Sequence, residues 1–209
     1  SFTQGNGESV NAQRTQTRGQ RRGYDRYQLR RSALIEKLRA LGMLPDASLR
    51  GLPKLQLWGL RSRAVTEQIA LPELGRVLLH LNQKRGYKST KSDFSGDKKT
   101  TDYVKTILNR YDQLTAEGLT IGQHLFKSLS ADPFYRCKEQ VYPRKAYVEE
   151  FDRVMACQRQ FYPQVLTDEN IRSIRDEIIY YQRPLKSCKH LVSLCEFETV
   201  SYTHLTLPT

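Results

Sequence analysis

The chain has 209 residues, a formal net charge of +12 at pH 7 and an isoelectric point near 9.6. The charge lies in the first half: residues 1–100 carry 20 Lys and Arg against 8 Asp and Glu, whereas residues 101–209 carry 14 of each. A basic segment of this kind indicates a polyanionic partner. No stretch approaches about 18 apolar residues and the first residues are polar, so the sequence predicts neither a membrane-spanning helix nor a secretory signal.

The first predicted element is one helix over residues 11–42. It holds seven arginines within eighteen residues, opposed by a single acid, Asp25. Five of the seven recur at every fourth position, which makes a slowly winding stripe on a helix of about 3.6 residues per turn. Like charges four residues apart cost a helix about 0.2–0.5 kcal/mol per pair, and a polyanion along the stripe would relieve that repulsion. The seven are Arg14, Arg18, Arg21, Arg22, Arg26, Arg30 and Arg31.

The arginine stripe favours a nucleic acid as its partner, because a guanidinium fork binds phosphate bidentately and also stacks on bases. A solvated surface helix is the plain alternative, but such helices usually mix Glu with Lys in compensating pairs. A membrane surface is disfavoured, since no Trp, Phe and Leu face flanks the arginines at the N-terminal end.

The second half of the same helix carries an apolar face. Tyr27, Leu34, Leu38 and Leu41 are spaced to lie on one side, so this part is expected to pack on protein. Gly42 is the expected helix stop. The helix therefore resembles a strut, with nucleic acid on one end and protein on the other.

The next segments are shorter. Pro45–Gly51 is predicted to be a connector, and residues 52–60 form an apolar patch around Trp58. A helical region is predicted over Thr66–Lys84, with a break or new start at Pro72.

A basic turn follows this helical region. Lys84 and Arg85 are predicted in the last helical turn, where cations offset the helix dipole. Gly86 is the predicted left-handed cap, and Tyr87 and Lys88 then interleave an aromatic with a cation.

The rest of the chain is predicted to be a polar linker and four amphipathic helices. No segment alternates as a strand does, so the fold class is mainly α, with a long arginine-rich helix followed by a loose multi-helix arrangement. The linker is Ser92–Lys99, and the helices run from Tyr103 to Leu114 with a stop near Gly118, from Gly122 to Leu129, from Lys145 to Gln160, and from Thr167 or Asp168 to about Tyr181.

No catalytic constellation is found in the sequence. Glu149, Glu150 and Asp152 form the one dense acid cluster, which is predicted to be a solvated charged face of a helix, with metal binding as the weaker alternative. His80 lies between leucines, which is typical of a packed imidazole. The chain has no Walker loop, nucleophile elbow or HExxH motif.

The four cysteines show neither paired CxxC spacing nor the density of a disulfide scaffold. Ordinary thiols in a reducing cytoplasm are the favoured interpretation. A zinc site built from Cys188, His190 and Cys195 stays open as an alternative without paired ligand spacing.

Three stretches in this order resemble one family, the type II CRISPR-associated RNA-guided DNA endonucleases of the Cas9 family, and among them the smaller II-C-like members. The arginine-rich sequence from Asn11 to Arg31 resembles their bridge helix. Glu73–Lys91 resembles the helix and basic turn that follow it. Gln182–Ser187, with Cys195 and Glu196 downstream, resembles the segment that closes their recognition lobe.

The resemblance implies a set of nucleic-acid-binding residues. The seven arginines would contact the guide RNA backbone, and cations and an aromatic of the later stretches would add RNA contacts. At Gln13 and Thr17 other members often carry further cations, so the grip on RNA is expected to be looser here. The added residues are Lys84, Arg85, Tyr87, Lys88, Arg183 and Lys186.

The resemblance also implies partners and a setting. The partners would be a guide RNA, made of crRNA and tracrRNA, and target DNA, bound in a monomeric ribonucleoprotein in the bacterial cytoplasm that defends against foreign DNA. In this family base pairing reads the target while the protein holds the heteroduplex through its backbone. The catalytic residues, and the Mg²⁺ that the parent nuclease is expected to use, would lie outside this sequence, so this part is expected to bind rather than to cleave.

The family resemblance sets the expected domain boundaries. Residues 1–10 would be a linker from a RuvC-like segment, 11–42 the bridge helix and 43–199 the helical recognition lobe. Residues 200–209 resemble a translated sequencing adapter and are expected to be a non-native tail.

Two other classes of protein are kept as alternatives. A free-standing basic RNA-binding protein, of ribosomal or RNA-chaperone type, would explain the charge but not the three ordered stretches. A helical adaptor would bind an acidic protein through its basic strut, and it predicts weak discrimination between nucleic acids and acidic polypeptides.

Overall fold

The computed structural model describes residues 10–88 and 98–182. Every secondary-structure element of these residues is a helix, apart from one isolated bridge between Tyr87 and Pro143, so the predicted mainly α fold is confirmed. None of the helices in these ranges is long and apolar enough to cross a membrane. They are α1 (Val10–Ala40), α2 (Ala47–Arg50), α3 (Lys54–Arg63), α4 (Leu71–Gln83), α5 (Lys98–Ala116), α6 (Ile121–Ala131), α7 (Arg144–Arg159), α8 (Asp168–Arg172) and the π-helix η2 (Ser173–Ile179).

The long helix α1 is uninterrupted, as predicted, and ends in a Schellman motif. Gly42 has a φ of 67°, a conformation that glycine adopts without steric cost. The N–H of Met43 donates to the carbonyl of Leu38 at 2.8 Å, and the N–H of Gly42 donates to that of Arg39 at 3.2 Å. Because Leu38 and Met43 are fully buried, this cap also ties the end of α1 into the core.

The segments after α1 are more helical than predicted. The connector Pro45–Gly51 contains α2, whose first turn is capped by the carboxylate of Asp46, which accepts from the N–H of Leu49 at 2.8 Å. The apolar patch around Trp58 is the helix α3. The predicted new helical start at Pro72 is confirmed to within one residue, since α4 begins at Leu71, whereas the helix predicted before it, from Thr66, is absent.

The later helices follow the predicted order. α5 stops before Gly118, which has a φ of 66°, and α6 opens with a capping box between Thr120 and Gln123. The predicted linker is wrong at its last two residues, Lys98 and Lys99, which belong to α5, while its residues 92–97 lie outside the described residues. The last predicted helix is α8 running on into η2.

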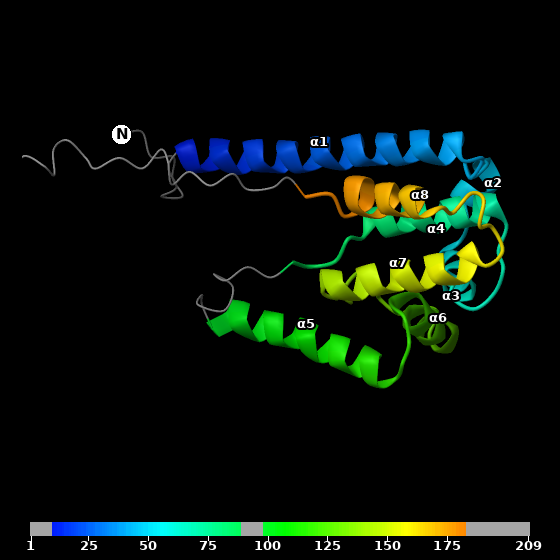
Figure 1. Ribbon diagram of the computed structural model, residues 1–209. Coiled ribbons are helices and arrows are strands. Elements are labelled where there is room, and N and C mark those ends of the chain that lie inside the picture. The colour runs from blue at the N-terminus through cyan, green and yellow to red at the C-terminus, as the bar shows by residue number, and fades with distance from the viewer. Residues whose placement is uncertain (1–9, 89–97, 183–209) are drawn as a thin grey trace, which may run out of the picture.

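Figure 1 shows how the helices are arranged around α1. The C-terminal half of α1 packs on α4 and η2, α3 packs between α4 and α6, and α6 contacts α7. α5 lies on the opposite side of the molecule from α1. The N-terminal half of α1 extends beyond the ends of α4 and α8. Residues of the shared core, such as Leu34, Leu78, Phe151 and Ile174, are all 0% exposed.

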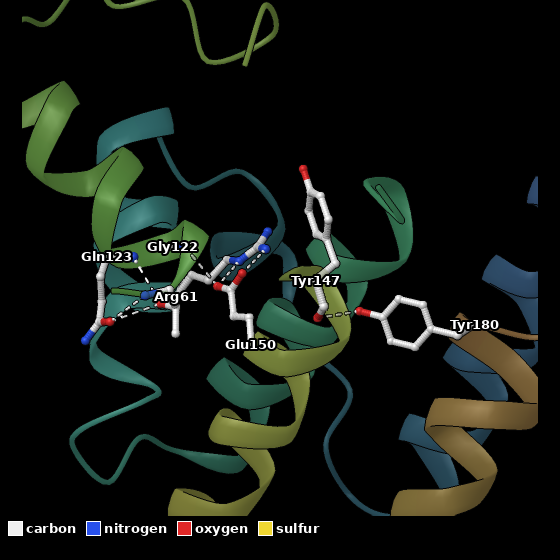
Figure 2. A network of polar contacts seen from close by, with 7 residues as sticks. Arg61, Gly122, Gln123, Tyr147, Glu150 and Tyr180 are labelled. Atoms are coloured by element: carbon white, nitrogen blue, oxygen red, sulfur yellow. Dashed lines mark hydrogen bonds and ion pairs between the residues drawn. The ribbon is translucent and has the colours of Figure 1, made fainter. Parts of the chain in front are cut away.

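A buried ion pair joins α3 to α7 inside this core (Figure 2). Nε and Nη2 of Arg61 donate to the two carboxylate oxygens of Glu150 at 2.6 and 2.5 Å, and both side chains are 0% exposed. The same carboxylate accepts from the backbone N–H of Gly122, the second residue of α6, at 3.0 Å. The prediction that Glu150 belongs to a solvated face is therefore wrong, since this one carboxylate links three helices.

The surroundings of Arg61 keep its guanidinium charged. Burial disfavours the charged form, but the charge of Glu150 and its hydrogen bonds outweigh burial and raise the pKa of Arg61. The rings of Trp58 and Tyr147 lie 5.0 and 5.5 Å from the guanidinium carbon and add cation–π attraction. Figure 2 also shows the hydroxyl of Tyr180 donating to the carbonyl of Tyr147 at 2.8 Å, which fastens the end of η2 to α7.

His80 is packed in the core, as predicted. Its ring is 6% exposed and lies edge-on to Trp58, with 4.7 Å between the ring centroids. Burial, and after it the positive charges of Arg61, Arg76 and Lys84, hold the pKa of His80 well below its ordinary value. The imidazole is therefore neutral in the folded protein near neutral pH.

The first testable prediction concerns the buried ion pair. Glu150→Gln should lower the free energy of unfolding by about 3–5 kcal/mol, because Arg61 then remains as a buried charge without a counterion. The neighbouring Glu149→Gln is the matched control and should cost less than about 1 kcal/mol, since its side chain is half exposed. Urea unfolding followed by circular dichroism measures both, and equal losses would contradict a special role for Glu150.

The second prediction concerns acid. An unfolded histidine titrates near about 6.5, and the folded pKa of His80 is lower, so the unfolded state binds more protons. The part of the free energy of unfolding that depends on neutral His80 is fully present above the unfolded pKa of about 6.5. It is lost as the pH falls through the folded pKa. NMR titration should show His80 titrating below the ordinary range, and His80→Phe should remove part of the acid destabilisation. If the free energies of unfolding of the parent and of His80→Phe change equally with pH, His80 is not a source of the acid destabilisation.

Candidate nucleic-acid interface

The arginine face of α1 is exposed over most of its length. Six of the seven arginines are exposed, Arg30 is half-buried, and none of the seven makes an ion pair within the part of the chain that the structure describes. Asp25, on the same helix, also pairs with none of them there. The predicted uncompensated stripe is thus present as a geometric feature. The six exposed ones are Arg14, Arg18, Arg21, Arg22, Arg26 and Arg31.

The stripe winds toward the body of the protein. Each step of four residues turns about 40° around a helix of 3.6 residues per turn, so the line from Arg14 to Arg30 turns about 160°. The same register continues beyond Arg30 at Leu34 and Leu38, both 0% exposed. One winding line on α1 therefore runs from exposed cations, through the half-buried Arg30, into the core.

The basic turn after α4 lies next to the start of α7. The N–H of Tyr87 donates to the carbonyl of Tyr142 at 2.9 Å, and the carbonyl of Tyr87 accepts from the N–H of Arg144 at 2.7 Å. Gly86 has a φ of 78°, and a Cβ there would lie 2.6 Å from Cδ2 of Tyr147. The positive φ predicted for Gly86 is confirmed, and the close contact with α7 leaves no room for a side chain there. The predicted cap is wrong, because α4 ends at Gln83 with Lys84 as its C-cap, so Lys84 and Arg85 do not lie in the last helical turn either.

Side chains of the basic turn point in different directions. Lys84 is half-buried, with Nζ 5.7 Å from the Trp58 ring centroid and 3.5 Å from the carbonyl of Cys137. Burial lowers the pKa of Lys84. Lys88 is exposed, and its Nζ donates to Oε1 of Gln182 at 2.6 Å. Lys84 thus faces the protein and Lys88 faces solvent, whereas Arg183 and Lys186 lie outside the described residues.

Three arginines from separate elements meet beside this turn: Arg30 of α1, Arg85 of the turn and Arg144 of α7. We call them the three-arginine junction. The Nε atoms of all three are shielded from solvent and have no hydrogen-bond partner, although Nη2 of Arg85 donates to the carbonyl of Tyr181 at 2.7 Å. Arg30 and Arg85 were both predicted as nucleic-acid-binding residues, and the fold brings them together.

The three-arginine junction is electrostatically strained. Burial, and then the charges of Arg30 and Arg144, lower the pKa of Arg85 to about 10. Burial, followed by the charge of Arg144, also lowers the pKa of Arg30. No carboxylate of the described residues contributes to either shift, so in this part of the chain the junction holds converging positive charge and unused donors. An anionic oxygen placed there would relieve both.

Arg144 is the residue of this junction that sequence reasoning missed. It lies just after Pro143, in the first turn of α7, and the only cation directly beside it in the sequence is Lys145. Its position depends on the bridge between Tyr87 and Pro143, a contact between distant segments. The available signal was limited to one more arginine near a predicted helix start.

A metal centre is not indicated by the described residues, which contain no group of three or more His, Cys, Asp or Glu side chains able to hold an ion. Cys137 and Cys157 are free thiols. The alternative zinc site at Cys188, His190 and Cys195 lies outside the described residues.

The class of molecule defined by these features is a helical protein segment that presents a long, uncompensated basic helix at its surface. No family model matches the chain. Its sequence is 26% identical over 159 residues to the CRISPR-associated endonuclease Cas9 of Campylobacter jejuni. The match covers 67% of this chain and 15% of that protein. The chain thus spans about a seventh of the length of this curated relative.

Solved structures agree with this match. The crystal structure of C. jejuni Cas9 in complex with sgRNA and target DNA superposes with a TM-score of 0.73, at 22% identity, over 91% of this chain and 28% of the other. Streptococcus thermophilus Cas9 in complex with the GGAA PAM gives a TM-score of 0.58 at 22% identity, over 86% of this chain and 16% of the other. The resemblance to the Cas9 family is therefore confirmed, and the fold is that of a helical segment of those proteins.

The third testable prediction concerns the Gly86 contact. Gly86→Ala should destabilise the protein by about 1–2 kcal/mol through its left-handed backbone and by about 1–3 kcal/mol more through the clash with Tyr147. Gly118→Ala is the matched control, because Gly118 has a similar φ but nothing within 4 Å of a Cβ. The difference between the two variants in thermal unfolding isolates the steric clash. Equal losses of stability would show that a Cβ at position 86 does not clash with α7.

Proposed function

We propose that this chain is a guide-RNA-binding and RNA–DNA-heteroduplex-binding segment of an RNA-guided DNA endonuclease acting in CRISPR defence. The observation that carries the proposal is the winding line of uncompensated arginines on α1, anchored on a helical fold like that of Cas9. The C. jejuni Cas9 structure, which superposes with a TM-score of 0.73, was solved with sgRNA and target DNA. This supports the same classes of partner here.

In this proposal α1 binds the charged phosphate backbone of the nucleic acid. Its exposed arginines would neutralise successive phosphates of one strand and release their counterions, which gives affinity without sequence preference. The three-arginine junction would accept a phosphate at the inner end of the line, where the unused Nε donors lie. The sequence of the target would be read by base pairing, with protein holding the backbone. No catalytic role is assigned to any residue of this chain.

The residues proposed to contact nucleic acid are those predicted from the sequence, with Arg144 added. Among them, Lys84 has the weakest claim, because its ammonium group faces Trp58 and Cys137. The full proposed set is Arg14, Arg18, Arg21, Arg22, Arg26, Arg30, Arg31, Lys84, Arg85, Tyr87, Lys88, Arg144, Arg183 and Lys186.

The fourth testable prediction is a salt dependence. Log affinity of the chain for a labelled single-stranded RNA should fall linearly with log salt, with a slope of about −0.7 per phosphate contact. Replacing Arg18, Arg22 and Arg26 together by Ala should flatten that slope by about 2, one contact for each side chain. Fluorescence anisotropy over a series of salt concentrations measures the slope.

A charge-matched control separates contact from net charge. A second triple variant removes three exposed cations that lie outside α1 and outside the proposed set, and it should leave the slope unchanged: Lys127→Ala, Arg136→Ala and Arg153→Ala. If both triples flatten the slope equally, net charge and not the arginine line governs binding. If polyglutamate displaces the labelled RNA as strongly as unlabelled RNA does, the chain is better described as a helical adaptor that binds an acidic protein.

A further inference from the structure

A second basic feature lies on α1 at its docked half, where α1, α2 and α4 enclose a cavity of about 190 Å³. Its walls combine apolar side chains with cations. Tyr27 and Ile35 of α1 and Leu79 of α4 supply the apolar part, and no Asp or Glu lines it. The cavity is separate from the three-arginine junction, because none of the three junction arginines lines it.

The floor of this cavity holds two buried polar side chains. Asn82 is 1% exposed, and its Oδ1 has no hydrogen-bond partner. Arg76 is 9% exposed, and its Nε donates to the carbonyl of Leu49 at 2.9 Å. Burial lowers the pKa of Arg76 and no carboxylate offsets it, so a cation sits in the floor without an acidic partner. A buried carbonyl left unpaired costs about 1–3 kcal/mol when no ligand satisfies it.

The mouth of the cavity is cationic as well. Arg31 and Arg39 of α1 and Arg50 beside α2 line it, and all three residues are exposed. Nε of Arg50 donates to the carbonyl of Pro45 at 3.0 Å, which holds that side chain at the rim. The lining thus combines a buried amide and apolar side chains with three exposed guanidinium groups.

We propose that this cavity binds one unpaired nucleotide of a bound RNA strand, with the base inside and its phosphate at the rim. The apolar walls and the Tyr27 ring suit the faces of a base, and the Asn82 amide suits a base edge that offers N–H donors. Arg31, Arg39 and Arg50 suit the phosphate. A base enclosed by these side chains has left its stack and its pairing partner, so the nucleotide must be unpaired. The proposal deepens the proposed function and rests on it for the identity of the strand.

The test uses the full chain with mononucleotide probes. In saturation-transfer NMR at low salt, AMP should receive its strongest saturation at the base protons H2 and H8, and it should bind about tenfold more tightly than ribose 5-phosphate, which lacks the base. Equal affinities, or saturation confined to the ribose protons, would overturn the proposal, because the site would then bind only phosphate.

Two tryptophan variants on the same helix locate the site. Ile35→Trp fills the cavity from its half-buried wall and should weaken AMP about tenfold, while Leu29→Trp, at a position that is 70% exposed and outside the cavity, should leave it unchanged. Arg39→Ala, at the exposed rim, is the second variant and should abolish the advantage of AMP over adenosine. Circular dichroism checks the fold of each. If AMP binding survives both Ile35→Trp and Arg39→Ala, the cavity is not its site.

Failure of this proposal is distinguishable from failure of the proposed function. If single-stranded RNA binds with the expected salt slope but AMP and ribose 5-phosphate bind alike, only the nucleotide site is refuted. If RNA binding shows no dependence on the α1 arginines while AMP still binds at the cavity, the proposed RNA-binding line is refuted and the cavity remains a nucleotide site.

Discussion

The structure depends on how the C-terminal half of α1 is docked. Leu34 and Leu38 are fully buried against α4 and η2, and the Schellman motif at Gly42 leads the chain directly into the core. Because a helix is rigid over a few turns, this anchoring fixes the rotation of the exposed half as well. The direction in which the arginines from Arg14 to Arg26 point is thus decided by leucines two or more turns away.

Glu150 is a buried acid with a buried partner, whereas most of the α1 arginines lie at the surface without one among the described residues. Glu150 is buried in the core, where it neutralises Arg61 and accepts a hydrogen bond from the start of α6. These contacts join α3, α6 and α7, and the basic turn lies against the start of α7. The α1 arginines and the three-arginine junction have no such partner among the described residues. The Arg61–Glu150 pair leaves no lone charge in the core, whereas the unpaired α1 arginines keep a surface that attracts anions.

Much of the fold could be predicted because helices leave a local pattern. The 3.6-residue spacing of apolar side chains located α1, α5, α6 and α7 within a few residues, and glycine marked where α1 and α5 end. The candidate site was only half predictable. Arg30 and Arg85 stood out as cations, but Arg144 joins them through a bridge between distant segments. Glu150 was misassigned for the same reason, because its partner Arg61 is 89 residues away in the chain.

The winding of the arginine line places a constraint on change in the chain. Adding or deleting one residue between Arg31 and Leu34 would rotate everything before it by about 100° and shift it by about 1.5 Å relative to the docked leucines. The arginines would keep their spacing yet face another side of the molecule. This stretch of α1 can therefore diverge by substitution, whereas a change of length there would uncouple the basic face from the body that orients it.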